Sequence, residues 1–64
     1  MKVLLMNLTQ RIREEFEDAP GLRISAAEAA QFWGLDVPTS EEVLTRLRET
    51  GFLSKGVDGR YQQV

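Results

Sequence analysis

Three pairs of adjacent acidic residues have the most obvious capacity for acid–base chemistry: Glu14–Glu15, Glu17–Asp18 and Glu41–Glu42. Neighbouring residues on a helix point about 100° apart, so no pair is placed to act as a joint acid and base or as a metal site. The chain contains no histidine and no cysteine, which removes the commonest general base, the usual nucleophile pairs and the commonest metal ligand. The sequence therefore predicts a protein that is not an enzyme and has no cofactor or metal.

Basic side chains offer a second kind of chemistry, the binding of phosphate groups. The chain has eight basic side chains, among them Arg23, Arg46, Lys55 and Arg60. The alternative interpretation is that they are solvated surface charges, paired with residues such as Glu42 or Glu49. Residues 1–38 carry four basic and six acidic side chains, and residues 39–64 carry four of each. Neither part is strongly basic, so phosphate binding depends on where these few side chains lie.

One small domain must position these residues, because the chain has 64 residues, of which 42% are hydrophobic and 28% charged. This composition is typical of a globular chain, and so short a domain buries only about 60% of the surface of its unfolded chain. We expect a single domain over residues 1–64. The longest apolar run, Val3–Met6, is too short for a bilayer span or a signal-peptide core, so we expect a cytoplasmic protein with no membrane partner.

The first expected element is a helix, because apolar residues recur at three- and four-residue steps on one face: Leu5, Leu8, Ile12 and Phe16. Two starting points fit the sequence. Asn7 caps a helix that begins at Leu8, with Gln10 as its capping-box partner, or the helix begins near Val3. Pro20-Gly21 ends the helix in either case.

A short strand and a second helix follow. Leu22–Ile24 alternates apolar, charged and apolar residues and needs a partner strand. Ser25 and Glu28 form a capping box that opens the helix, whose alanine face allows a neighbouring helix to approach closely. Gly34 supplies the backbone freedom needed to leave this helix abruptly.

A third helix and a hairpin complete the expected fold. The segment Thr39–Glu42 reads as another capping box that opens the helix, and Pro38 argues against a helical interior before it. The buried stripe of this helix is Ser40, Val43, Leu44 and Leu47, and Gly51 follows its last residue. Asp58-Gly59, between residues 52–55 and 60–63, predicts a β-hairpin. With the strand at 22–24, the hairpin forms a small antiparallel sheet in an α+β fold.

The order and spacing of these residues resemble the winged helix-turn-helix domains of MarR-type and GntR-type bacterial regulators. The shared pattern is a strand, a Ser-initiated helix with Glu-Ala-Ala, an apolar-Gly-apolar turn, a capped helix ending Leu-x-x-x-Gly, and a two-stranded wing. The matching residues are Ile24, Ser25, Glu28-Ala29-Ala30, Trp33-Gly34-Leu35, Thr39, Leu47, Gly51-Phe52-Leu53 and Asp58-Gly59-Arg60-Tyr61. Such domains usually have one further helix before this pattern, and the N-terminal helix of this chain has that position.

The resemblance implies a small DNA-binding, transcription-regulator-like protein of the bacterial cytoplasm, acting as a homodimer on two half-sites. Its third helix would enter the major groove and its wing would contact the backbone. Thr39, Thr45 and Arg46 would then face the groove, and Lys55 and Arg60 the phosphates. The base-reading positions fall near Pro38, Thr39, Glu41 and Glu42.

A protein-interaction module on the same fold, with no DNA partner, is the alternative. An acidic start to the third helix and an exposed Phe32 favour this interpretation. Glu41 and Glu42 also have a purely structural explanation, because acidic side chains stabilise the first turn of a helix.

The remaining apolar residues divide between core and surface. Trp33, Phe52 and Tyr61 are expected in the core. The N-terminal run is either a frayed terminus or, as we favour, a dimer contact, because self-association stabilises a small domain. This contact consists of Val3, Leu4, Leu5 and Met6.

Overall fold

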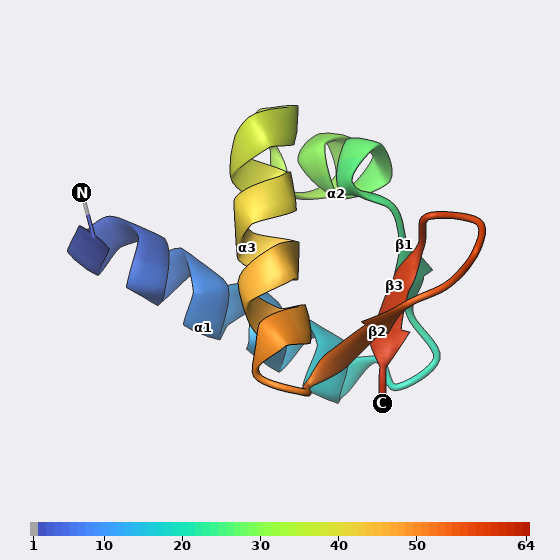
Figure 1. Cartoon of the computed structure of the whole chain (residues 1–64). Helices are drawn as coiled ribbons and strands as arrows, with labels where there is room; N and C mark the ends of the chain where they lie inside the picture. The colour runs from blue at the N-terminus through green and yellow to red at the C-terminus, as the bar shows by residue number, and fades with distance from the viewer. Residues whose placement is uncertain (1) are drawn as a thin grey trace.

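The computed structural model describes residues 2–64, with side chains from Leu5 onward, and contains three helices and a three-stranded antiparallel sheet (Figure 1). The helices are α1 (Lys2–Asp18), α2 (Ala26–Trp33) and α3 (Val37–Glu49). The strands are β1 (Arg23–Ile24), β2 (Leu53–Lys55) and β3 (Tyr61–Gln63). The expected α+β class is confirmed. No helix within residues 2–64 is long and apolar enough to cross a membrane.

Helix α1 starts at Lys2, so Asn7 lies inside the helix rather than at its cap. Its predicted apolar stripe is confirmed, because Ile12 and Phe16 are buried and Leu5 and Leu8 pack against the same core. The chain turns after α1 through residues 19–22, where the Leu22 N–H donates to the Ala19 carbonyl at 2.9 Å. The Pro20-Gly21 pair occupies the centre of this turn, as its residue types favour.

Helix α2 begins with the predicted capping box. The Ser25 hydroxyl accepts from the Glu28 N–H at 3.1 Å, and the Glu28 carboxylate accepts from the Ser25 N–H at 2.9 Å. The helix ends at Gly34, whose φ of 67° lies in the left-handed region that glycine adopts without steric cost. Residues 34–36 are therefore enough to turn the chain from α2 into α3.

Helix α3 begins two residues earlier than Thr39, so the predicted Thr39–Glu42 capping box is wrong. Asp36 is the N-cap, and its carboxylate accepts from the Thr39 N–H at 2.7 Å. Pro38 fits the first helical turn because the N–H that it lacks would have no partner within the helix. Ser40, in the second position of the predicted box, is buried, and its hydroxyl donates to the Asp36 carbonyl at 3.0 Å.

The end of α3 leads directly into the hairpin. Gly51, with φ of 85°, follows the cap residue Thr50. The Phe52 N–H donates to the Leu47 carbonyl and the Gly51 N–H to the Arg48 carbonyl, both at 3.0 Å. These two hydrogen bonds satisfy carbonyls at the end of the helix and fix where β2 starts.

The sheet has the order β1-β3-β2, so the strand preceding α2 pairs with the last strand of the chain. In register, Ile24 lies opposite Tyr61, and Tyr61 lies opposite Lys55. The hairpin turn closes through a bond from the Gly59 N–H to the Gly56 carbonyl at 3.0 Å. The expected hairpin and its pairing with the strand near residues 22–24 are confirmed.

Every helix and strand contributes to one hydrophobic core. Its buried members are Ile12, Phe16, Ile24, Ala29, Val43, Leu44, Leu47, Leu53 and Tyr61. The Phe16 ring lies 6.1 Å from the Trp33 ring and 6.4 Å from the Phe52 ring, measured between centroids. Of the three aromatic residues expected in the core, Tyr61 is buried, whereas Trp33 and Phe52 are half-buried against it.

Candidate nucleic-acid interface

The exposed surface of α3 carries both acidic and basic side chains. Ser40, Val43, Leu44 and Leu47 face the core, and the exposed positions lie around the rest of the helix. The exposed charged side chains are three carboxylates and two guanidinium groups: Glu41, Glu42, Glu49, Arg46 and Arg48. Thr45 is exposed as well. A duplex approaching α3 would thus meet three negative and two positive charges, a surface that attracts phosphate only weakly.

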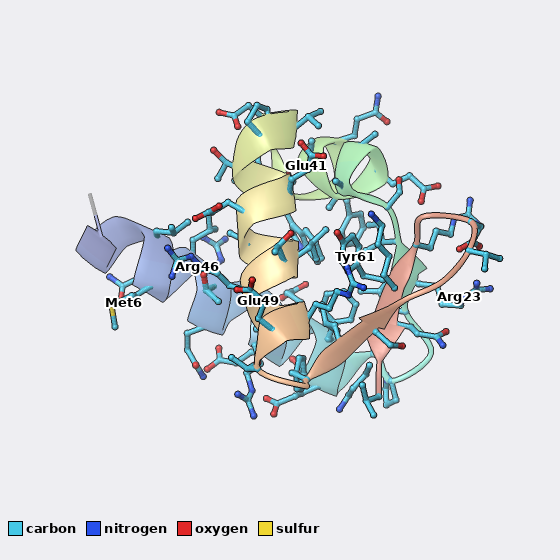
Figure 2. The ribbon with its side chains drawn as sticks, in the orientation of Figure 1. Met6, Arg23, Glu41, Arg46, Glu49 and Tyr61 are labelled. Atoms are coloured by element: carbon cyan, nitrogen blue, oxygen red, sulfur yellow. The ribbon has the colours of Figure 1, made fainter. Side chains whose placement is uncertain are left out.

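The other two groove contacts expected on α3 lie toward α1. Arg46 lines a shallow groove together with Met6, Gln10 and Arg13 of α1; Figure 2 labels Arg46 and Met6. Thr39 is half-buried and lines a second groove with Leu8 and Arg11. The structure therefore does not bring Thr39, Thr45 and Arg46 onto one strip of α3, since Thr45 alone of the three lies on the outward side.

Arg46 also has an acidic neighbour within its own helix. Its guanidinium lies 3.2 Å from the Glu42 carboxylate, one helical turn earlier. Pairing with Glu42 was one of the two interpretations of Arg46 that the sequence left open. Both side chains are about half exposed, at 50% and 53%, so this ion pair is weak and water can reach it.

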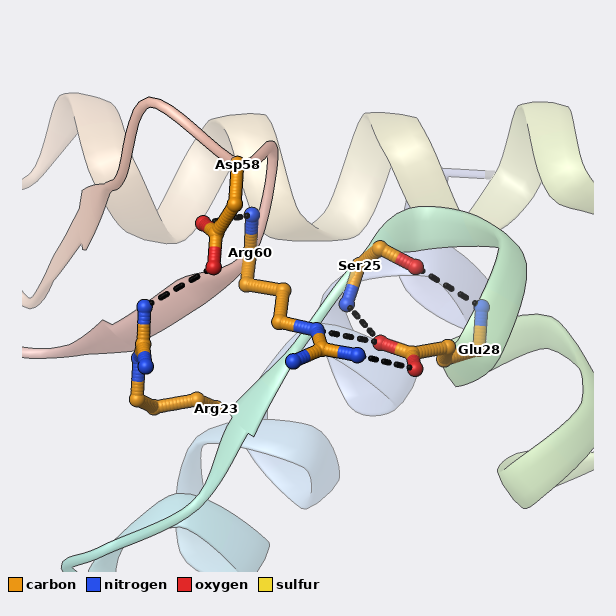
Figure 3. Close-up of polar contacts among 5 residues, drawn as sticks. All are labelled: Arg23, Ser25, Glu28, Asp58 and Arg60. Carbon is orange, nitrogen blue, oxygen red and sulfur yellow. Dashed lines mark hydrogen bonds and ion pairs between the residues drawn. The ribbon is translucent and has the colours of Figure 1, made fainter.

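On the hairpin, Lys55 and Arg60 have different environments. The Lys55 ammonium lies 5.5 Å from the centre of the Tyr61 ring, in a cation–π arrangement, and the residue is exposed. Arg60 reaches back to α2, where its Nε and Nη2 atoms donate to the two oxygens of Glu28 at 3.1 and 3.0 Å (Figure 3). This two-bond geometry is the strongest form of an arginine–carboxylate pair.

Glu28 consequently serves two partners. Its carboxylate accepts from the Ser25 backbone N–H, which closes the capping box, and from Arg60. The pKa of Glu28 lies below its ordinary value of 4.5, first because of the Ser25 N–H bond and then because of the Arg60 bond. The same pair raises the pKa of Arg60. Both groups therefore stay charged at neutral pH.

A second ion pair ties the turn of the hairpin to β1. The Arg23 guanidinium donates to the Asp58 carboxylate at 2.9 Å, and the other Asp58 oxygen accepts from the Arg60 N–H at 3.1 Å. The Arg60 N–H bond, followed by the attraction of Arg23, lowers the pKa of Asp58 below its ordinary 3.8. The hairpin is thus attached at two points, to α2 through Glu28 and to β1 through Arg23.

Sequence reasoning missed both attachments. Arg60 and Glu28 are 32 residues apart, and Arg23 and Asp58 are 35 apart. Their proximity depends on the pairing of β1 with β3, which places Arg23 opposite Gln62. The sequence marks Glu28 by its capping box and Asp58 by its turn, and both by the winged-helix pattern, but a single sequence carries no signal of which acidic residue meets which arginine.

Met6, one of the residues expected at a dimer contact, lies at the opposite end of the molecule from Arg23 (Figure 2). Met6 is 67% exposed, whereas Leu5 is half-buried and packs against the core. The predicted contact at Val3 and Leu4 falls outside the side chains that the structure describes.

Phe32 is 64% exposed, as expected, and its ring stands edge-on to Trp33 at a centroid distance of 5.3 Å. In the described part of the chain, no three acidic side chains form a group that could hold a metal ion.

Comparison with known protein families, with curated proteins and with solved structures finds no match for this chain.

Proposed function

We propose that this chain is a winged helix-turn-helix domain that binds double-stranded DNA as a small, transcription-regulator-like protein. The observation that carries the proposal is the arrangement of α2, α3 and the hairpin. Residues 34–36 join two helices that pack together, and a β-hairpin follows α3 directly and pairs with the strand before α2. In helix-turn-helix proteins the second of the two helices enters the major groove, which is the part assigned here to α3.

The proposed contacts are few, so the expected affinity is low. Thr45 is the outward side chain of α3 suited to a groove contact, and Arg46, Lys55 and Arg60 are the candidates for phosphate. Three phosphate contacts correspond to a slope of about −2 to −3 in a plot of log affinity against log salt. A dimer that presents two such surfaces would double the number of contacts and address two half-sites.

Fluorescence anisotropy with a labelled duplex of mixed sequence tests the proposal, at salt concentrations from about 50 to about 200 mM. Replacing Arg46, Lys55 and Arg60 together by Ala should flatten the slope by about 2 to 3. Arg11→Ala is the control for the loss of a single positive charge, at an exposed position on α1. Unchanged affinity and slope after the triple substitution would contradict the assignment.

Self-association is the second part of the proposal. The exposed Met6 supports it, because a large apolar side chain on the N-terminal half of α1 is available to a second copy. We expect a melting temperature that rises with protein concentration, and Met6→Glu should remove this dependence. A monomer at high micromolar concentration by light scattering, with stability unchanged after deletion of residues 1–6, would rule out the dimer.

A protein-interaction module without DNA binding is the competing proposal. It is favoured by the exposed carboxylates of α3, Glu41, Glu42 and Glu49, and by the exposed Phe32. No duplex binding at about 50 mM salt would favour this alternative. Affinity capture should then depend on these surfaces, so that Phe32→Ala or Glu41→Lys loses the partner while Glu14→Gln on α1 keeps it.

A further inference from the structure

The arginine on the hairpin is already engaged by an internal carboxylate in a geometry that resembles phosphate recognition. Arg60 presents two parallel donors to Glu28 at 3.1 and 3.0 Å. An arginine fork binds a phosphate through the same two-donor arrangement. One guanidinium edge therefore has two competing acceptors, Glu28 within the chain and a phosphate from a duplex.

We propose that Glu28 is an autoinhibitory residue, which holds Arg60 away from DNA until a duplex displaces it. This inference rests on the proposed DNA-binding function and concerns the regulation of the same surface. Asp58 reinforces it, because it fixes the turn of the hairpin to Arg23 at 2.9 Å and accepts from the Arg60 N–H at 3.1 Å (Figure 3). Backbone and side chain of Arg60 are thereby both set in the self-paired arrangement.

The exposure of the pair makes the exchange feasible. The side chains of Arg60 and Glu28 are each 46% exposed, and those of Arg23 and Asp58 are 50% and 42% exposed. A phosphate can reach Arg60 without unfolding any element, and an exposed ion pair opposes it only weakly. The carboxylate also repels an approaching phosphate, so its charge weakens DNA binding twice, by occupying Arg60 and by repulsion.

Glu28→Gln separates these roles from the structural one. Glutamine at this position still completes a capping box with Ser25, so α2 keeps its N-terminal cap while the charge on residue 28 is lost. We expect about two- to fivefold tighter duplex binding at about 50 mM salt. The slope of log affinity against log salt should change by less than about 0.9, because Arg60 already contacts a phosphate in the complex of the unsubstituted chain.

Two controls identify the cause of any gain. Glu14→Gln makes the same charge change on the exposed surface of α1, so it measures the effect of net charge alone. Arg60→Ala, alone and combined with Glu28→Gln, measures whether the gain passes through Arg60. The inference requires that the gain from Glu28→Gln is smaller in the Arg60→Ala background, where only the repulsion is relieved, and exceeds that from Glu14→Gln. Far-UV circular dichroism and urea unfolding confirm that each variant is folded.

The outcomes of this experiment distinguish the inference from the proposed function. Binding by Glu28→Gln but not by the unsubstituted chain supports it, as does a gain that depends on Arg60. If the unsubstituted chain binds DNA but Glu28→Gln binds no more tightly, or the gain is undiminished without Arg60, the inference is wrong and the proposed function stands. If neither protein binds at about 50 mM salt, both are wrong.

Discussion

Replacing Phe16 by Ala should remove much of the stability of the domain. Phe16 is fully buried, at 0% exposure, and its ring contacts Trp33 of α2 and Phe52 at the start of the hairpin. Loss of a buried phenylalanine side chain costs about 3–5 kcal/mol. A domain of this size has a free energy of unfolding of about 3–10 kcal/mol, so the substitution removes a third or more of it and loosens the two elements that Phe16 supports.

Phe32→Ala is the matched control, because it deletes the same atoms from a side chain that is 64% exposed. With about a third of the ring buried, the expected loss is about 0.5–1 kcal/mol. Urea unfolding followed by far-UV circular dichroism gives both values without relying on Trp33, whose fluorescence either substitution would perturb. If Phe16→Ala is unfolded without urea, Phe16→Leu should still cost about 1–2 kcal/mol. Equal losses from Phe16→Ala and Phe32→Ala would refute this description of the core.

Two further predictions concern the backbone and the acidic side chains. Gly51→Ala should destabilise the domain by about 1 kcal/mol or more, because φ at Gly51 is 85°. Gly21→Ala, at a site without positive φ and with nothing within 4 Å of the added carbon, should change stability by less than about 0.5 kcal/mol in urea unfolding; similar effects of both would contradict the backbone argument. Stability should also fall with acidification below about pH 4.5, because three carboxyl groups have pKa values below their ordinary ones. Hydrogen bonds from Ser25 and Arg60 lower the pKa of Glu28 from 4.5. Hydrogen bonds from Thr39 lower the pKa of Asp36 from 3.8, and the Arg60 N–H lowers that of Asp58 from 3.8. A carboxylate with a lowered folded-state pKa stabilises the fold above its unfolded pKa and loses that effect as the pH falls through the folded one. A urea midpoint that stays constant from about pH 7 to about pH 3 would contradict this account.

The elements of the fold were largely predictable because their signals are local. The apolar spacing of Ile12 and Phe16, the Ser25–Glu28 capping box and the Asp58-Gly59 turn each act over a few residues. The predicted start of α3 was wrong, and the reason is local too. Two capping patterns overlap there, and a proline fits the first turn as well as it fits the residue before a helix, so Asp36 competes with Thr39 as the cap.

The arrangement of charge at the candidate interface was not predictable from the sequence. Arg46 can be placed near Glu42 because one helical turn separates them. The pairing of Arg60 with Glu28 instead depends on strand register and on the position of α2 beside the hairpin. The sequence indicates basic residues at positions suited to DNA contacts. The structure adds that one of them, Arg60, makes a two-bond ion pair with Glu28 of the same chain.

An amide NMR titration of isotope-labelled protein with a duplex of mixed sequence tests the proposed DNA interface most directly. At about 50 mM salt, the account predicts the largest shifts at Thr45, Lys55 and Arg60, and their loss at about 200 mM. Small shifts are expected at Glu14 and Phe32, which lie outside the proposed surface. Shifts confined to Glu14 and Phe32, or no shifts even at the lower salt concentration, would contradict the claim that α3 and the hairpin bind DNA.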